Sequence, residues 1–159
     1  MNTKGNIQDK SNFYSPLEFI RPLTEVRGNL FDVTPMILVG MGTCGIGNGA
    51  DLVYDRVQKH IDETNAVCTL KKTGCFGFCA EEPLLTLYQP GRPMLVYSKV
   101  DEKDAVRIVD GLLKGKIYQK KLLCRIDAWD FHKVKIEFGK GYENIPHWDE
   151  IPFFKGKLR

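Results

Sequence analysis

The stretch from residue 36 to residue 74 constrains the fold most, because its hydrophobic pattern changes from strand-like to helical and back. Residues 36–39, MILV, form a compact apolar run that is typical of a buried strand. After a glycine-dense loop, apolar side chains recur at spacings of three and four over residues 50–64, as on one face of a helix. Residues 65–74 then predict a second strand. Two strands joined through a helix are expected to run parallel, with a right-handed crossover.

The segments that follow predict a hairpin and a second helix. Residues 83–100 contain two apolar runs around QPGRP, whose proline and glycine are typical of a turn. Residues 100–115 have helical periodicity, with Asp101 as the expected N-cap and Gly115 as the stop. The side chains expected to face inward along this helix are Val106, Val109, Leu112 and Leu113. The whole order predicts an α/β fold, with a mixed sheet flanked by helices.

Composition and charge exclude several classes of protein. With 159 residues, 43% of them hydrophobic and 27% charged, the chain has the make-up of one soluble globular domain with a tail. Its net charge of +3 is dispersed, unlike the concentrated basic patch of a nucleic-acid-binding protein. The apolar runs are too short for membrane insertion, and the N-terminal residues lack a secretory apolar core. We therefore expect a cytoplasmic protein whose cysteines stay reduced.

Two glycine-rich segments carry the cysteines that point to chemistry. The chain has five cysteines, and an odd number argues against a closed set of disulfides. Cys44 follows the first predicted strand, and TGCFGFCAEEP contains Cys75 and Cys79. Their C-x3-C spacing is one residue wider than the C-x-x-C of thioredoxin-type redox enzymes. The acidic pair after Cys79 is expected to raise the pKa of a nearby thiol, which disfavours nucleophilic use and favours metal ligation.

The glycines around these cysteines favour an iron–sulfur cluster among the possible metal sites. Such clusters need thiolates on short flexible loops whose backbone N–H groups donate to sulfur, and glycine permits that close approach. The residues alone leave open a zinc site with three cysteines and a histidine, a thiol redox enzyme, and a site that has lost its metal. Phe76 and Phe78 flank the cysteines, and one of them is expected to shield a cluster while the other packs inward.

Three segments carry a family resemblance. Over about residues 36–115, the chain resembles the thioredoxin-like [2Fe–2S] ferredoxin family. The segments that carry the resemblance are, in order, VGMGTCGIGNGA, KTGCFGFCAEEPLLTLYQPGRPMLVYSKV and DEKDAVRIVDGLLKG. The resemblance is to the small subunit, or the N-terminal domain of the flavin-containing NADH-oxidising subunit, of bifurcating hydrogenases, formate dehydrogenases and Complex I relatives. It implies a thioredoxin-like ferredoxin domain, a [2Fe–2S] cluster, and an electron-transfer subunit that is not itself catalytic.

The resemblance also assigns the cluster ligands. The family has cysteines spaced C-x4-C in the first loop and C-x3-C in the second. Cys75 and Cys79 match the second pair, and Cys44 matches the later member of the first pair. The earlier member falls on Val39, which cannot bind iron. Cys68 is the candidate for the fourth ligand, with a buried core cysteine as the alternative. The missing thiol leaves a cluster-free structural assembly subunit as the alternative function.

The remaining segments are interpreted as an arm and a tail. We expect an N-terminal arm with a short helix in residues 1–33, the ferredoxin-type domain in residues 34–118, and a C-terminal docking tail in residues 119–159. The sequence YENIPHWDEIPFFKGKLR resembles the linker that leads into the NADH-binding domain of the flavin subunit. The expected partners are that flavin-containing NADH-binding subunit and other iron–sulfur subunits. Alternatively, the aromatic tail packs back on its own domain.

Two further expectations concern charged residues outside the cysteines. Glu81 and Glu82 follow Cys79 directly, and they are expected to lie in a solvated loop. His60, near the end of the first long helix, is expected to be a solvated helix-end residue that interacts with the helix dipole.

Overall fold

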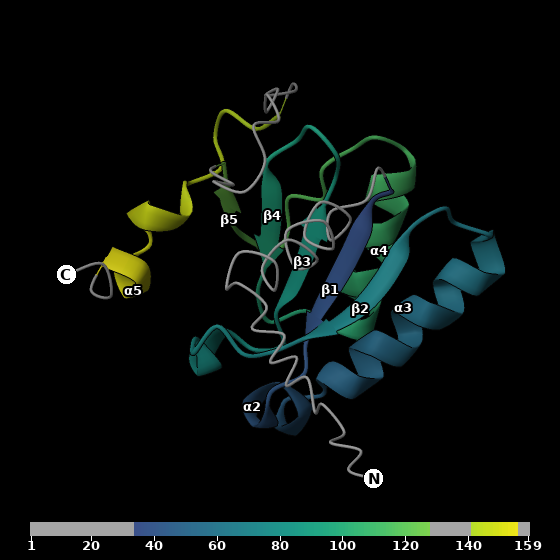
Figure 1. Cartoon of the computed structure of the whole chain (residues 1–159), viewed down its shortest axis with the longest axis horizontal. Coiled ribbons are helices and arrows are strands. Elements are labelled where there is room, and N and C mark those ends of the chain that lie inside the picture. The colour runs from purple at the N-terminus through teal and green to yellow at the C-terminus, as the bar shows by residue number, and fades with distance from the viewer. Residues whose placement is uncertain (1–33, 128–140, 156–159) are drawn as a thin grey trace, which may run out of the picture. The chain divides into compact units, whose positions relative to one another are not determined.

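The computed structural model describes residues 34–127 and 141–155, so the arm expected in residues 1–33 lies outside the described residues. The described elements, labelled in Figure 1, are β1 (Met36–Gly40), α2 (Thr43–Gly47), α3 (Ala50–Thr64), β2 (Thr69–Thr73), η1 (Cys79–Glu81), β3 (Leu85–Tyr88), β4 (Met94–Tyr97), α4 (Glu102–Leu113), β5 (Leu122–Ile126), η2 (Trp148–Glu150) and α5 (Pro152–Lys155). The η elements are single turns of 3₁₀ helix.

The strands form one mixed sheet in the order β2-β1-β3-β4-β5 (Figure 1). β1 and β2 are parallel, with α2 and α3 in the connection between them, as the sequence predicts. The β1–β3, β3–β4 and β4–β5 pairs are antiparallel. This arrangement confirms the predicted mixed sheet flanked by helices.

β5 is a strand that the sequence pattern does not predict. Its residues, LLCRI, pair with β4, so the sheet continues beyond residue 118, into the segment interpreted as a tail. Cys124 lies opposite Val96 in this pair and is buried. The strand is short and lies at the edge of the sheet, and four of its five residues are only partly buried, so it lacks a clean apolar alternation.

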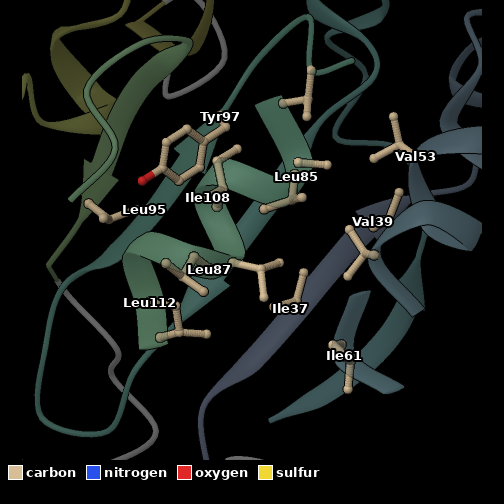
Figure 2. Close-up of a cluster of buried hydrophobic side chains, with 14 of the residues drawn as sticks. Ile37, Val39, Val53, Ile61, Leu85, Leu87, Leu95, Tyr97, Ile108 and Leu112 are labelled. Atoms are coloured by element: carbon tan, nitrogen blue, oxygen red, sulfur yellow. The ribbon is translucent and has the colours of Figure 1, made fainter. Parts of the chain in front are cut away.

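One face of the sheet carries the main core. Directly paired residues on β1, β3 and β4 share this face, and the apolar stripes of α3 and α4 pack against it (Figure 2). The buried residues of α3 are Ala50, Val53, Val57 and Ile61, as the helical periodicity predicts. On α4 the prediction was wrong for Leu113, which is 44% exposed, and for Val106, which is only partly buried. The buried apolar stripe of α4 consists of Ala105, Ile108, Val109 and Leu112.

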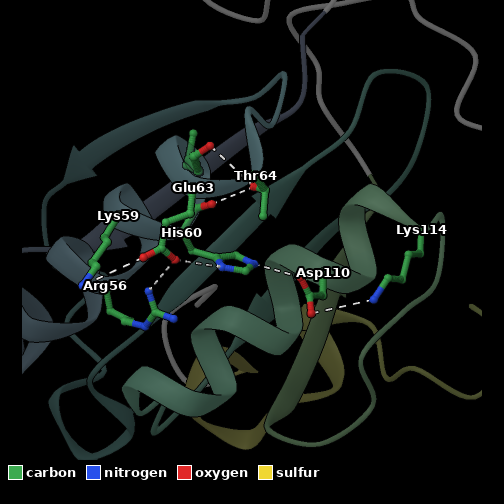
Figure 3. Close-up of polar contacts among 8 residues, drawn as sticks. Arg56, Lys59, His60, Glu63, Thr64, Asp110 and Lys114 are labelled. Carbon is green, nitrogen blue, oxygen red and sulfur yellow. Dashed lines mark hydrogen bonds and ion pairs between the residues drawn. The ribbon is translucent and has the colours of Figure 1, made fainter.

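A polar bridge joins the two long helices. His60 Nε2 lies 2.8 Å from Asp110 Oδ1, and the His60 side chain is largely buried between α3 and α4 (Figure 3). Glu63 and Lys114 extend this network on either side. The prediction of a solvated helix-end histidine was therefore wrong, because the packing of α4 against α3 encloses the imidazole ring.

The opposite face of the sheet carries a smaller apolar cluster. Leu84, Val96 and Cys124 are its buried members, and Trp148 and Ile151 from the C-terminal segment pack against them. The backbone N–H of Arg125 donates to the carbonyl of Pro146, which ties this segment to β5. Residues 141–155 thus pack back on their own domain, as the alternative interpretation of the tail predicts. None of the described helices has the length and apolar character needed to cross a membrane.

Candidate functional site

The ends of β1 and β2 bring the two cysteine segments together. Gly40 pairs with Thr73 at the last position of the parallel ladder, and Met41 N donates to Thr73 O at 2.8 Å. Both strands therefore end at the same end of the sheet, and each continues into a cysteine segment. A Cβ atom on Gly42 would lie 2.8 Å from Cys75 Cβ, so the missing side chain at position 42 is what lets the two segments touch.

Cys44 lies on a short helix and not in a glycine loop as predicted. α2 has five residues, and Ile46 N donates to Gly42 O at 2.9 Å. Asn48 closes the turn, because both its backbone N–H and its side-chain Nδ2 donate to Cys44 O, at 3.1 and 2.7 Å. Glycine has low helix propensity, so these hydrogen bonds override the local preference.

A backbone hydrogen bond holds the sulfur of Cys75. The N–H of Gly77 donates to Cys75 Sγ at 3.0 Å, and Gly77 has a φ of 77°, in the left-handed region that glycine adopts without strain. Backbone N–H groups that donate to cysteine sulfurs are the contacts that position and tune iron–sulfur ligands. The segment between Cys75 and Cys79 thus has the local geometry expected of a ligand loop.

The thiol of Cys79 contacts the thiols of both Cys44 and Cys75. All three side chains are exposed, so three sulfur atoms from two segments gather at one accessible place. These contacts are pairwise: within residues 34–127 and 141–155, no group of three or more His, Cys, Asp or Glu side chains surrounds a single ion position. A two-iron cluster takes its ligands in pairs, one pair at each iron, whereas a single ion requires all of its ligands around one point.

The pKa of Cys79 is raised, chiefly by the hydrogen bond with Cys44 and then by burial, while the hydrogen bond with Cys75 lowers it. The main cause of the raised pKa is therefore a neighbouring thiol, whereas the sequence led us to expect the acidic pair. A raised pKa keeps this sulfur protonated near neutral pH in the metal-free protein, which makes it a weak nucleophile. The arrangement does not favour thiol–disulfide exchange.

Cys68 lies at the opposite end of β2 from the other cysteines. It precedes Thr69, which pairs with Met36, whereas the cysteine segments begin at the Gly40 end of the ladder. The five residues of β2 separate it from that end by roughly 16 Å at strand rise. Its side chain packs against the main core, and burial raises the pKa of its thiol. The structure thus does not bring Cys68 to the site, and it supports the core-cysteine alternative.

Two other residues, Cys124 and Val39, are buried in the hydrophobic clusters and are not available as ligands. Burial raises the pKa of Cys124 to about 12, so this thiol is inert. Val39, at the position of the missing family thiol, is fully buried in the main core (Figure 2). Three thiols therefore lie at three of the four cysteine positions of the pattern that the sequence resemblance implies, and the fourth position carries a hydrocarbon side chain.

The two glutamates after Cys79 have different environments. Glu81 lies near the surface, with its Oε1 3.2 Å from Lys99 Nζ. Glu82 is only 5% exposed, so the prediction of a solvated loop was wrong for this residue. Its Oε2 accepts a hydrogen bond from Leu84 N at 2.8 Å. An acidic pair before a proline is typical of a surface turn, and the local sequence pattern does not indicate which of the two side chains is buried.

The phenylalanines beside the cysteines also differ. Phe76 is 41% exposed. Phe78 is partly buried and stacks on Phe153, with ring centroids 4.0 Å apart and planes within 1°. Phe154 contacts both rings edge-on. Phe78 is thus the ring that packs inward, and its partners come from the C-terminal segment.

Comparison with known proteins gives a likeness of fold. No family model matches the chain, and no curated protein matches it. Among solved structures, it is similar to a thioredoxin-like [2Fe–2S] ferredoxin from Aquifex aeolicus, with 18% identity and a TM-score of 0.51 over 58% of this chain and 92% of that chain. A cysteine-to-serine variant of that ferredoxin matches with 17% identity and a TM-score of 0.50 over 56% of this chain and 97% of that chain. The chain therefore has the thioredoxin-like ferredoxin fold.

Proposed function

We propose that this chain is an electron-transfer protein in which Cys44, Cys75 and Cys79 bind a [2Fe–2S] cluster. One observation carries the proposal: the thiol of Cys79 contacts thiols from two separate segments, on a fold shared with a ferredoxin that is named for such a cluster. When bound, the cluster would accept and release one electron at a time.

The residues around the thiols would hold and expose the cluster. The paired ends of β1 and β2 fix the separation of the two segments, and the N–H of Gly77 stabilises negative charge on Cys75 Sγ. Phe76 and Ile46 are exposed next to the cysteines, so a redox partner that docks there would contact apolar surface within a short distance of the sulfurs. The chain itself would bind, orient and shield, without making or breaking substrate bonds.

The wider assignment follows the sequence resemblance. We propose a cytoplasmic accessory subunit of an NAD(P)H-linked flavin and iron–sulfur oxidoreductase, of the bifurcating hydrogenase, formate dehydrogenase or Complex I type. Its partners would be the flavin-containing NADH-binding subunit and other iron–sulfur subunits. Because residues 141–155 pack on their own domain, the docking surface would include this packed segment as well as the exposed ring of Phe76.

The wider assignment is tested by deletion of residues 143–159 from the chain, co-expressed with its native flavin subunit. Loss of co-purification supports docking through the tail. Unchanged recovery of the complex contradicts it. The change Phe76→Ala tests the second part of the surface in the same assay, with Leu113→Ala, an exposed apolar residue on α4, as the control.

The alternative function is a cluster-free assembly subunit, and one observation favours it. Val39 is packed into the core where the family pattern has its first cysteine. Metal analysis of anaerobically purified protein separates the two functions. Brown protein with near-stoichiometric iron and acid-labile sulfide supports the electron carrier. Colourless, iron-free protein after anaerobic reconstitution supports the assembly subunit, and zinc in place of iron contradicts both.

A further inference from the structure

We infer that the carboxylate of Glu82 is the fourth ligand of the cluster, in place of the thiol that is missing at Val39. This inference rests on the proposed function and goes beyond it, because the family pattern uses cysteine at all four positions. The Glu82 carboxylate is buried beside Gly40, at the end of β1, and Gly45, the residue after Cys44.

Glu82 is a buried carboxylate with one oxygen left over. Its Oε2 accepts the hydrogen bond from Leu84 N, whereas Oε1 is buried and has no hydrogen-bond partner among the described residues. Removing a carboxylate from water without satisfying its oxygens is costly, so buried charged groups are normally paired or bound to metal. We therefore expect Oε1 of Glu82 to bind a further group.

The backbone places Glu82 one 3₁₀ turn after Cys79. Glu82 is three residues after Cys79, across the single 3₁₀ turn η1, and Glu82 N donates to Cys79 O at 3.4 Å. In a 3₁₀ turn the side chains at positions i and i+3 lie on the same side. The two side chains thus leave the turn on one side.

The same carboxylate lies against the segment that carries Cys44. A Cβ atom on Gly45, the residue after Cys44, would lie 3.3 Å from Glu82 Oε2. A Cβ atom on Gly40 would lie 3.1 Å from Oε2 and 3.3 Å from Oε1. Gly40 directly follows Val39 in β1, and successive strand side chains alternate between faces, so the carboxylate lies against the backbone at this end of β1 and not beside the Val39 side chain.

The chemistry of iron permits this substitution. Protein-bound iron accepts carboxylate as well as thiolate and imidazole ligands, and some two-iron clusters already replace cysteine at one iron. A carboxylate supplies one negative charge, as a thiolate does, so the net charge of the ligand set is unchanged. The rival explanation is a water molecule that reaches Oε1 from the surface cleft of about 300 Å³ that Glu82 lines together with Lys99 and Asn48.

The direct test uses the wild-type chain, reconstituted anaerobically with ⁵⁷Fe and sulfide and measured by Mössbauer spectroscopy. Glu82 ligation predicts two inequivalent ferric sites, one with two thiolates and one with a thiolate and an oxygen. Two equivalent sites, both with all-sulfur parameters, would overturn the inference and leave the electron-carrier proposal standing. A chain that takes up no iron would overturn both.

A matched pair of variants gives the second test. The change Glu82→Gln removes the charge but keeps an oxygen for Leu84 N, and it should speed cluster loss to a chelator at least tenfold. The control Glu81→Gln alters the neighbouring glutamate, which is near the surface, and should leave the rate unchanged. Equal rates in wild-type and Glu82→Gln proteins would contradict the inference.

Thermal unfolding of the metal-free proteins separates ligation from a structural role. A ligand carboxylate that is unsatisfied without metal opposes folding, so metal-free Glu82→Gln should be at least as stable as metal-free wild type. A water-bridged structural carboxylate predicts the reverse, a lower unfolding midpoint together with unchanged Mössbauer parameters. That combination would assign Glu82 to the fold and not to the cluster.

Discussion

The helix-covered face of the sheet and the cysteine end of the same sheet are built by opposite means. On the helix-covered face, paired strand residues meet the apolar stripes of α3 and α4, and the polar bridge between those helices has its partners. At the cysteine end, three thiols are exposed, a carboxylate oxygen is buried without a partner in the described part of the chain, and glycine is needed where two segments touch.

This contrast indicates where stability and function reside. On the helix-covered face, the residue type at each position suits both its local structure and its packing, which is typical of residues selected for folding. The cysteine end departs from those local rules in several places at once, and such departures cluster at functional sites. Variants in the first region should therefore change stability without removing the site, and removal of a thiol in the second should remove the site without a large change in stability.

The largest expected effect is at Cys75. The change Cys75→Ser should abolish cluster binding, because this sulfur is one of the three that gather at the site and the one that Gly77 N–H contacts. The matched control is Cys68→Ser, at the far end of β2, which should retain full iron and sulfide. Iron analysis and the visible absorption spectrum measure both. Full cluster retention in Cys75→Ser, or its loss in Cys68→Ser, would refute the assignment.

The next effect is on the core. The change Leu85→Ala, at a fully buried position, should lower the free energy of unfolding of the metal-free protein by about 2–5 kcal/mol. The exposed control Val67→Ala should change it by less than about 0.5 kcal/mol. Denaturant unfolding measures both. If Cys75→Ser lowers the stability of the metal-free protein as much as Leu85→Ala does, the distinction between the two regions is not real.

A smaller effect is expected where the segments touch. A side chain at position 42 would press on Cys75 Cβ, so Gly42→Ala should cost about 1–3 kcal/mol and reduce iron loading. Gly47→Ala is the control: a Cβ atom there meets nothing within 4 Å, and alanine is the better helix former, so it should be neutral or slightly stabilising. Equal iron loading in the two variants would show that the contact at Gly42 is not needed.

The smallest effect concerns pH and the helix–helix bridge. The hydrogen bond from His60 is the main cause that lowers the pKa of Asp110. This bridge therefore stabilises the fold above the ordinary aspartate pKa of 3.8, and its contribution is lost as the pH falls through the lower folded value. Because Asp110 is partly exposed, Asp110→Asn should cost less than about 1 kcal/mol at neutral pH. If the free energies of unfolding of Asp110→Asn and wild type differ by the same amount at pH 2 as at neutral pH, this cause is contradicted.

The parts of the fold that the sequence predicts are those with strong periodicity. β1, α3, β2, the β3–β4 hairpin and α4 follow from apolar spacing, turn residues and one cap, all of which are signals of local sequence. β5 and α2 do not follow from it. β5 is a short edge strand that exists because β4 offers a partner, and α2 is a glycine-containing turn held by contacts that close around Cys44.

The candidate site divides in the same way. Cys44, Cys75 and Cys79 are recognisable from spacing and glycine content. The location of Cys68 is not, because only the strand register shows that it lies at the other end of β2. The burial of Glu82 is also invisible in the sequence, since it depends on how the turn after Cys79 folds against Gly40 and Gly45.

The central claim is that sulfurs from two segments hold one redox-active centre, and electron paramagnetic resonance tests it most directly. The anaerobically reconstituted chain is titrated with dithionite and the spectrum is recorded at low temperature. The account predicts a half-integer-spin signal that integrates to nearly one spin per chain in wild type and is absent in Cys75→Ser. A reduced wild-type sample with no such signal and no bound iron would contradict it.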